Sequence, residues 1–202
     1  MKRTFPILCF IVCVIVFAGI GESKAVVLTF DDLPWASNAT IPSPYGGLYW
    51  SNTFHYTYTY YGNGRVSDSG IAFNDWAKDV SVYSTSGTFN WNGAYFTAYS
   101  GTKDLNLDLE GWSGGTLIYS TTLYPITDSP SWFNVNWQNI DTLTIHSYRS
   151  SGHFYGSHFL MDNFTINEPF QAPVPEPSTI LLLGSGLLGI VGLRKRMQTK
   201  TS

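Results

Sequence analysis

The feature that most constrains the fold is a repeated alternation of apolar and polar residues between positions 26 and 166. Residues 54–60 alternate aromatic with polar side chains, and a Gly-Asn-Gly turn signal follows at 62–64. Residues 105–110 alternate leucine with Asn, Asp and Glu in the same way. No segment of useful length shows a helical period, so the pattern predicts short strands separated by turns, and hence an all-β domain.

About ten strands of this kind fit residues 26–168, and they are rich in β-branched and aromatic side chains. This predicts a two-sheet β-sandwich of the jelly-roll type, in which one face of each sheet packs on the core and the other faces solvent. In the last strand, Leu160, Phe164 and Ile166 are expected on the core side, together with Asp162. The pattern resembles the jelly-roll folds of carbohydrate-binding modules.

The first 25 residues have the layout of a secretory signal peptide. A basic start at Lys2 and Arg3 precedes an apolar run over residues 5–20, and small residues at Ser23 and Ala25 suit a cleavage site. The alternative is an N-terminal anchor that stays attached, although the apolar run is short for a membrane span. Cleavage after Ala25 is the expected outcome.

The C-terminal segment has three parts in a fixed order. A Pro-rich linker over residues 169–177 ends in Val174, Pro175, Glu176 and Pro177. The last part, residues 178–202, starts with an uncharged apolar stretch over 178–193 and continues with a basic cluster at 194–196. The stretch predicts a short transmembrane helix, with the basic cluster inside and the β domain outside.

This order of parts resembles the PEP-CTERM sorting signal. The resemblance implies that a membrane sorting protease, an exosortase, recognises and processes the tail. The protein is therefore expected at the cell surface or in the extracellular matrix of a biofilm, after a transient single-pass stage in the inner membrane. The resemblance concerns delivery and does not assign an activity to the domain.

Charge and cysteine content exclude several classes of function. Between residues 26 and 170 there are four basic and twelve acidic side chains, a net charge of −8. So acidic a domain repels phosphate backbones, which excludes nucleic acid as a partner. Both cysteines, Cys9 and Cys13, lie in the first apolar run. The mature domain therefore has no disulfide, zinc-thiolate site or cysteine nucleophile.

Three carboxylates predict a structural calcium site. Asp162 shares the phase expected to face the core, where a charge must be paired, hydrogen-bonded or bound to a cation. Asp31 and Asp32 directly follow the first strand, which often neighbours the last strand in a jelly roll. Oxygen ligands suit calcium. The alternative is a turn in which Asp31 and Asp32 bond to their own backbone.

Catalytic patterns are weak. Residues 111–115 satisfy Gly-x-Ser-x-Gly, but a strand rather than a helix is expected after them, so a hairpin loop explains them better. The spacing of His146, His153 and His158 matches no established zinc pair. Asp104, Asp108 and Glu110 share one strand face and leave a glycan hydrolase open as the alternative to a non-catalytic protein.

Aromatic residues are the remaining signal. Phe, Trp and Tyr make up thirty of the 145 residues from 26 to 170, which is more than a small core is expected to absorb. Flat rings near loops suit stacking on sugars, and the candidates for ligand binding are Trp112, Trp91 and Trp50. The predicted function is non-catalytic binding of extracellular polysaccharide. A glycan hydrolase and a purely structural matrix or adhesion protein are the alternatives.

Overall fold

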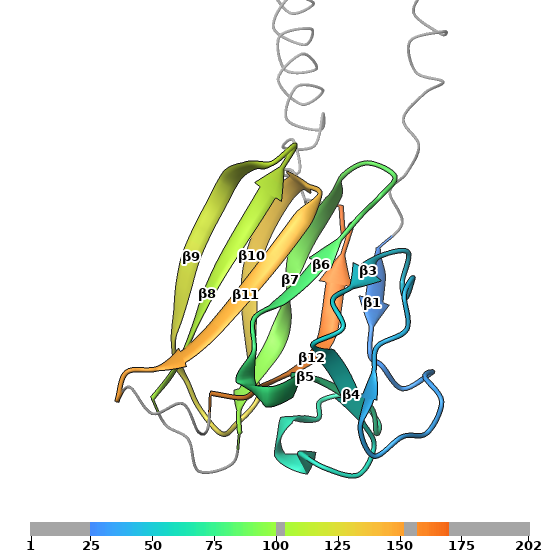
Figure 1. Cartoon of the computed structure of the whole chain (residues 1–202), viewed down its shortest axis with the longest axis vertical. Helices are drawn as coiled ribbons and strands as arrows, with labels where there is room; N and C mark the ends of the chain where they lie inside the picture. Colours follow the sequence, from blue (N-terminus) through green and yellow to red (C-terminus); the bar gives the residue numbers. More distant parts are fainter. Residues whose placement is uncertain (1–24, 100–103, 152–156, 170–202) are drawn as a thin grey trace, which may run out of the picture. The chain divides into compact units, whose positions relative to one another are not determined.

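Two antiparallel β-sheets form a sandwich in the computed structural model (Figure 1). The structure describes residues 25–99, 104–151 and 157–169. By its contacts the chain divides into Met1–Pro169 and Phe170–Ser202. The predicted signal peptide, most of the Pro-rich linker and the predicted transmembrane helix lie outside the described residues. Within the described ranges no helix is long and apolar enough to cross a membrane.

The seven-stranded sheet has the order β10-β7-β12-β5-β4-β2, and β1 also pairs with β12. The predicted neighbourhood of the first and last strands is confirmed, because Val26 lies opposite Ile166 and Leu28 opposite Phe164. The strands of this sheet are β1 (Val26–Leu28), β2 (Ala39–Thr40), β4 (Phe54–Thr57), β5 (Ile71–Asn74), β7 (Phe89–Ala98), β10 (Ser131–Ile140) and β12 (Phe159–Ile166).

The five-stranded sheet has the order β3-β6-β11-β8-β9. Its strands are β3 (Tyr49–Trp50), β6 (Val80–Tyr83), β8 (Leu105–Ser113), β9 (Thr116–Ile126) and β11 (Thr142–Arg149). Two short 3-10 turns, Gly62–Gly64 and Asp75–Ala77, are the helical elements of the described residues. The all-β sandwich predicted from the alternation is therefore confirmed.

Aromatic rings dominate the core between the sheets. Trp91 is fully buried and stacks on Phe164, with ring centroids 5.7 Å apart and planes at 19°. Trp50 meets the edge of Phe54 at 5.0 Å. Leu105, Leu107 and Leu109, which the alternation placed on one face of β8, are all buried. The core thus contains many of the domain's aromatic residues, more than the sequence led us to expect.

A second, smaller core lies on the outer face of the seven-stranded sheet. Ile71, Phe73 and Leu160 are buried there, with Tyr61 packed against them. The backbone of Gly64 approaches so closely that an added Cβ would lie 2.6 Å from Leu160 Cδ1 and 2.7 Å from Ile71 Cδ1. A segment between β4 and β5 therefore covers this face.

The predicted phase of β12 is wrong over its first half. Its pairing with β7 is irregular between Asp162 and Thr165, and Asn163 in this interval has a left-handed φ of 50°. The extra residue of such a bulge reverses the alternation. Phe164 and Ile166 join the main core, whereas Leu160 joins the small outer core. Asp162, two residues after Leu160, lies on the outer side.

Candidate functional site

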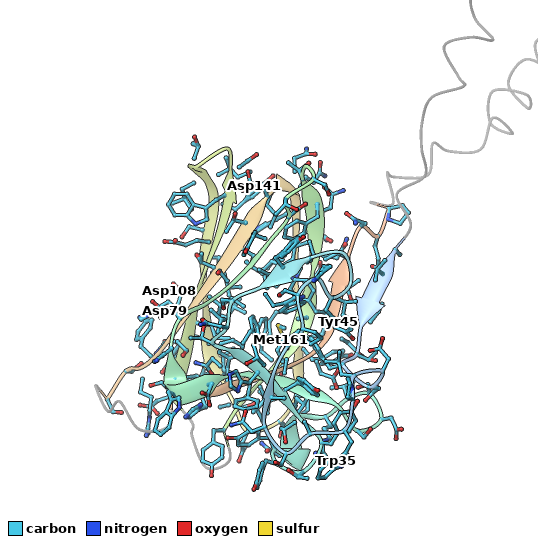
Figure 2. All side chains as sticks on the ribbon, turned by 45° about the vertical axis from the view of Figure 1, so that its right-hand side comes forward. Trp35, Tyr45, Asp79, Asp108, Asp141 and Met161 are labelled. Atoms are coloured by element: carbon cyan, nitrogen blue, oxygen red, sulfur yellow. The ribbon has the colours of Figure 1, made fainter. Side chains whose placement is uncertain are left out.

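A cleft of about 530 Å³ opens on the outer face of the five-stranded sheet. It lies over the neighbouring strands β6, β11 and β8. Figure 2 shows Asp79 and Asp108 next to each other at this side of the molecule, whereas Met161 lies at its centre. The lining residues are Asp79, Val80, Ser81, Asp108, Glu110, Thr144, Ile145 and His146.

Strand alternation explains why this face is polar. In β11, Leu143 and Ile145 are buried in the core, so Thr144 and His146 point to the other side. In β8 the buried leucines likewise leave Asp108 and Glu110 on the outer side. The register sets His146 opposite Asp108. The cleft is thus built from residues that are distant in sequence and adjacent across strands.

Hydroxyl donors hold the two carboxylates of β8. Thr122 Oγ1 donates to Asp108 Oδ1 at 2.6 Å. Thr144 Oγ1 donates to Glu110 Oε2 at 3.3 Å. Across the cleft, His146 Nδ1 pairs with Asp79 Oδ1, and both side chains are more than half exposed. These contacts fix the direction of the acidic groups while leaving them open to solvent.

A tyrosine ring borders the cleft. Tyr148 is 37% exposed and stacks on the His146 ring, with centroids 5.6 Å apart and planes at 23°. Its hydroxyl lies 3.5 Å from Asp108 Oδ1. Desolvation and the nearby charge of Asp108 raise the pKa of Tyr148, so the hydroxyl keeps its proton at neutral pH and can donate a hydrogen bond.

Asp104 is separate from the other two acids of its strand face. Arg149 Nε donates to its Oδ1 at 2.7 Å, and the Ser151 N–H donates to its Oδ2 at 3.1 Å. The Ser151 side chain and Arg149 together lower the pKa of Asp104 to about 2. An acid this strong is ionised at neutral pH and cannot act as a general acid. The predicted trio therefore reduces to Asp108 and Glu110.

Two of the three predicted ligand-binding tryptophans are core residues. Trp91 is fully buried and Trp50 is 5% exposed, so neither ring presents a face to solvent. The sequence predicted both rings near loops, but in the structure each fills an inward position of its strand. Trp112 is half-buried in β8, and its Nε1 is enclosed without a hydrogen-bond partner in the described structure. Of the three tryptophans, only Trp112 keeps part of its ring exposed to solvent.

The Gly-x-Ser-x-Gly sequence forms the predicted hairpin. β8 ends at Ser113 and β9 begins at Thr116, with Gly114 and Gly115 at left-handed φ values of 56° and 75°. The Gly114 N–H donates to Asp141 Oδ2 at 2.6 Å. No helix follows Ser113, so the strand–turn–helix context of a nucleophile elbow is missing from this hairpin. Of the predicted histidine group, His153 lies outside the described residues.

Backbone donors surround the Asp162 carboxylate. The N–H groups of Val66 and Ser67 donate to its Oδ2 at 2.7 and 2.8 Å, and the Asn163 N–H donates to its Oδ1 at 2.7 Å. Asp162 is fully buried. The expectation that this charge needs partners holds: two of the three N–H groups come from the segment that covers the outer face, and the third comes from Asn163 of β12 itself.

Asp31 holds the next part of the same segment. The N–H groups of Ser69 and Gly70 donate to its Oδ1 at 2.7 and 2.6 Å. Desolvation opposes ionisation of Asp31, but these bonds outweigh it and keep its pKa below the usual 3.8. Asp32 instead accepts a 2.7 Å bond from the Tyr45 hydroxyl. Asp31 and Asp162 thus converge on one segment, residues 66–70.

The calcium site built on Asp31, Asp32 and Asp162 stays a prediction. N–H donors and a metal ion compete for the same carboxylate lone pairs. The observed hydrogen bonds can therefore stabilise the charges of Asp31 and Asp162 in place of a metal ion. Among the described residues, no group of three or more His, Cys, Asp or Glu side chains is arranged to hold a metal ion.

Residues 173–196 match the family model of the PEP-CTERM protein-sorting motif. The chain carries a PEP-CTERM sorting motif. Val174, Pro175, Glu176 and Pro177 lie within the match, so the predicted position of the sorting signal is confirmed. The PEP-CTERM motif indicates an exported protein with a C-terminal sorting signal, and it implies processing by an exosortase. No curated protein matches the sequence.

Solved structures with a similar chain path include carbohydrate-binding modules. The tandem CBM22 domain of Paenibacillus barcinonensis Xyn10C is 13% identical with a TM-score of 0.43, covering 79% of this chain and 49% of that one. This chain thus spans about half of that structure. TmCBM61, solved with β-1,4-galactotriose, is 12% identical with a TM-score of 0.38, covering 60% and 88%.

A third similar structure is the K1 cleaved adhesin domain of Lys-gingipain from Porphyromonas gingivalis W83. It is 10% identical, has a TM-score of 0.40, and the match covers 71% of this chain and 97% of that one. TM-scores below 0.5 assign no ligand to the PEP-CTERM chain. Its function has to be argued from its own cleft.

Sequence reasoning missed the cleft because it is assembled by register. Asp108 and Glu110 were recognised as a polar face, but Asp79 and Tyr148 were not connected with them. The signal was present in the matching alternation of residues 105–110 and 142–148. Only the pairing of β11 with both β6 and β8 turns those two patterns into one site.

Proposed function

We propose that this exported protein is non-catalytic and binds a neutral or weakly cationic extracellular polysaccharide in the cleft of the five-stranded sheet. The observation that carries the proposal is the composition of the cleft. Carboxylates and hydroxyls line its floor, and the exposed Tyr148 ring stands beside them on His146. Sugars offer hydroxyl groups to the former and an apolar ring face to the latter.

The charge of the cleft supports the choice of polymer. Asp79, Asp108 and Glu110 line it, and His146 is the sole titratable base among its lining residues. The domain as a whole has a net charge of −8 between residues 26 and 170. Like charges oppose the approach of a strongly anionic polymer, whereas a neutral or amino-bearing polymer meets no such barrier.

The sorting motif supports the place of action. In this proposal the exosortase processes the chain near Pro175–Ser178 after the tail has spanned the inner membrane. The β domain then remains at the cell surface or in the extracellular matrix. A domain delivered there meets extracellular polysaccharide at high local concentration, where modest affinity for each site is sufficient.

A panel of neutral, cationic and anionic polysaccharides immobilised in native gels tests the proposal. We expect the wild-type protein to be retarded by a neutral or cationic polymer. Asp108→Ala and Tyr148→Ala should each restore its mobility, because they remove an acceptor and a stacking face. Trp35→Ala is the matched control, since Trp35 is 73% exposed on a loop outside the cleft. No retardation by any polymer would leave the structural matrix protein as the better account.

One observation favours a hydrolase as the second candidate. Asp108 and Glu110 lie two residues apart on one strand face, which is roughly 6.6 Å at about 3.3 Å per residue. Paired carboxylates of glycosidases are about 5–9.5 Å apart. Release of reducing ends from a bound polysaccharide, abolished by Glu110→Gln, would establish the hydrolase and overturn the non-catalytic proposal.

A further inference from the structure

β9 is a free edge of the five-stranded sheet. It pairs with β8 on one side, and the sheet order places no described strand on its other side. Figure 1 shows β9 as the outermost strand of its layer. An unpaired edge presents a row of N–H and C=O groups to any extended chain that approaches it. At eleven residues, Thr116–Ile126 is the longest strand of the described structure.

This flank of the sandwich is almost free of charge. β10 is the edge of the other sheet and contacts β9, so the two edges lie together. Residues 116–140 cover both strands and contain one charged residue, Asp128, in a domain of net charge −8. Natural edges are usually blocked by lysines, inward charges, proline or bulges. β9 has no lysine; it has Pro125 at its second-last position and two register irregularities against β8, which leave residues 119–123 regularly paired.

The uncharged flank also exposes apolar side chains. Leu117 and Ile118 are each 42% exposed, Tyr124 is 60% exposed, and Trp132 of β10 is 39% exposed. Protein interfaces are depleted in charged residues at their centre and enriched in Tyr and Trp. Two copies of a domain carrying −8 repel each other least where each presents an uncharged surface.

The residue order in β9 is self-complementary. Antiparallel pairing about Thr121 sets Ser120 opposite Thr122, which are both polar. It also sets Ile118 opposite Tyr124 of the second copy; both side chains are exposed, and each lies at a register irregularity between β9 and β8. Opposing side chains of antiparallel strands have Cβ atoms about 4.5–5.5 Å apart, so the apolar pair is in contact.

We propose that β9 pairs antiparallel with β9 of a second copy of this chain, about a two-fold axis at Thr121. Such an isologous contact closes on itself as a dimer. It joins two five-stranded sheets into one, and the axis perpendicular to the sheet keeps both outer faces on the same side. If the cleft binds polysaccharide as proposed above, the dimer carries two binding sites on one surface and gains avidity.

Sedimentation equilibrium of the full chain tests the dimer. We expect the wild type to sediment as a dimer and the variant Ile118→Lys/Tyr124→Lys to sediment as a monomer, because the pairing sets two lysines directly opposite each other. The matched control, Val27→Lys/Trp35→Lys, places lysines at two exposed residues away from β9 and should remain dimeric. Melting curves that match the wild type show that both variants are folded. A monomeric wild type, or a dimer that persists in the first variant, would overturn the proposal.

A charge-exchange variant tests the register itself. Ile118→Glu/Tyr124→Lys sets opposite charges against each other in the proposed pairing, so it should restore the dimer lost in the double-lysine variant. A parallel pairing, or an interface formed elsewhere, would not bring these two positions together. If the exchange variant stays monomeric, the two-fold axis at Thr121 is wrong. None of these variants touches a residue that lines the cleft, so loss of the dimer and loss of polysaccharide binding can be distinguished.

Discussion

His146 of β11 lies directly opposite Asp108 of β8, and both side chains open onto the same cleft. The pairing places an imidazole between two carboxylates, because Asp79 binds His146 from the β6 side. An arrangement of this kind presents several hydrogen-bonding groups on one rigid sheet surface.

Asp162→Ala is expected to destabilise the domain strongly. The substitution removes the buried carboxylate that accepts from the N–H groups of Val66 and Ser67, and each such loss costs about 1–3 kcal/mol. We expect the free energy of unfolding to fall by about 3 kcal/mol in urea titrations. Asp128→Ala removes an exposed carboxylate and should change it by less than about 0.5 kcal/mol. Equal effects of the two substitutions would contradict the clamping role of Asp162.

The contribution of Asp31 should disappear in acid. Its pKa is lowered in the folded state, so its stabilising effect is present above the unfolded value near 3.8 and is lost as the pH falls through the lower folded value. We therefore expect wild type and Asp31→Asn to differ in stability at pH 7 and to converge below pH 3.8. Urea midpoints over a pH series provide the measurement. A difference that grows towards low pH would show that the sign of the pKa shift is wrong.

Calcium can be tested independently of these hydrogen bonds. An ion bound only to the folded state raises stability by about 2.7 kcal/mol at a hundredfold excess over its dissociation constant. If the site predicted at Asp31, Asp32 and Asp162 binds calcium, the melting midpoint should be higher in calcium than in chelator, and Asp32→Asn should reduce the difference. Identical midpoints would contradict the site and would leave the N–H donors of residues 66–70 as the partners of Asp31 and Asp162.

Trp91 and Trp112 should behave differently when truncated. Trp91→Ala empties a fully buried position and should cost about 3–5 kcal/mol of stability. Trp112 is half-buried, so Trp112→Ala should cost clearly less in the same thermal or urea unfolding measurement. If Trp91→Ala were the milder change, the description of the core would be wrong.

The sequence indicated the sheets well and their irregularities poorly. The regular alternation of residues 105–110 and 142–148 survives in β8 and β11, because no extra residue interrupts those strands. In β12 the alternation reverses at a bulge that contains one left-handed residue, Asn163, and the sequence pattern alone cannot locate a bulge. The buried positions of Trp50 and Trp91 depend on long-range packing, which local patterns do not encode. The cleft depends on register between three strands for the same reason.

Mass spectrometry can test whether the chain is processed at both ends. The sorting motif at 173–196 and the basic, apolar start predict a mature protein that begins near Val26 and ends near Pro175–Ser178. Peptide mapping of protein recovered from the cell surface would show the two new termini. A recovered chain that still ends at Ser202 would contradict processing at the motif.

Affinity measured by isothermal titration tests the central claim most directly. The titrant is a short oligosaccharide of the polymer that retards the wild type in gels, and the protein is the wild type, Tyr148→Ala or Trp35→Ala. The account predicts measurable binding by the wild type and by Trp35→Ala. It also predicts at least a tenfold loss of affinity in Tyr148→Ala, about 1.4 kcal/mol, with an unchanged melting temperature. Full affinity in Tyr148→Ala would contradict the cleft as the binding site.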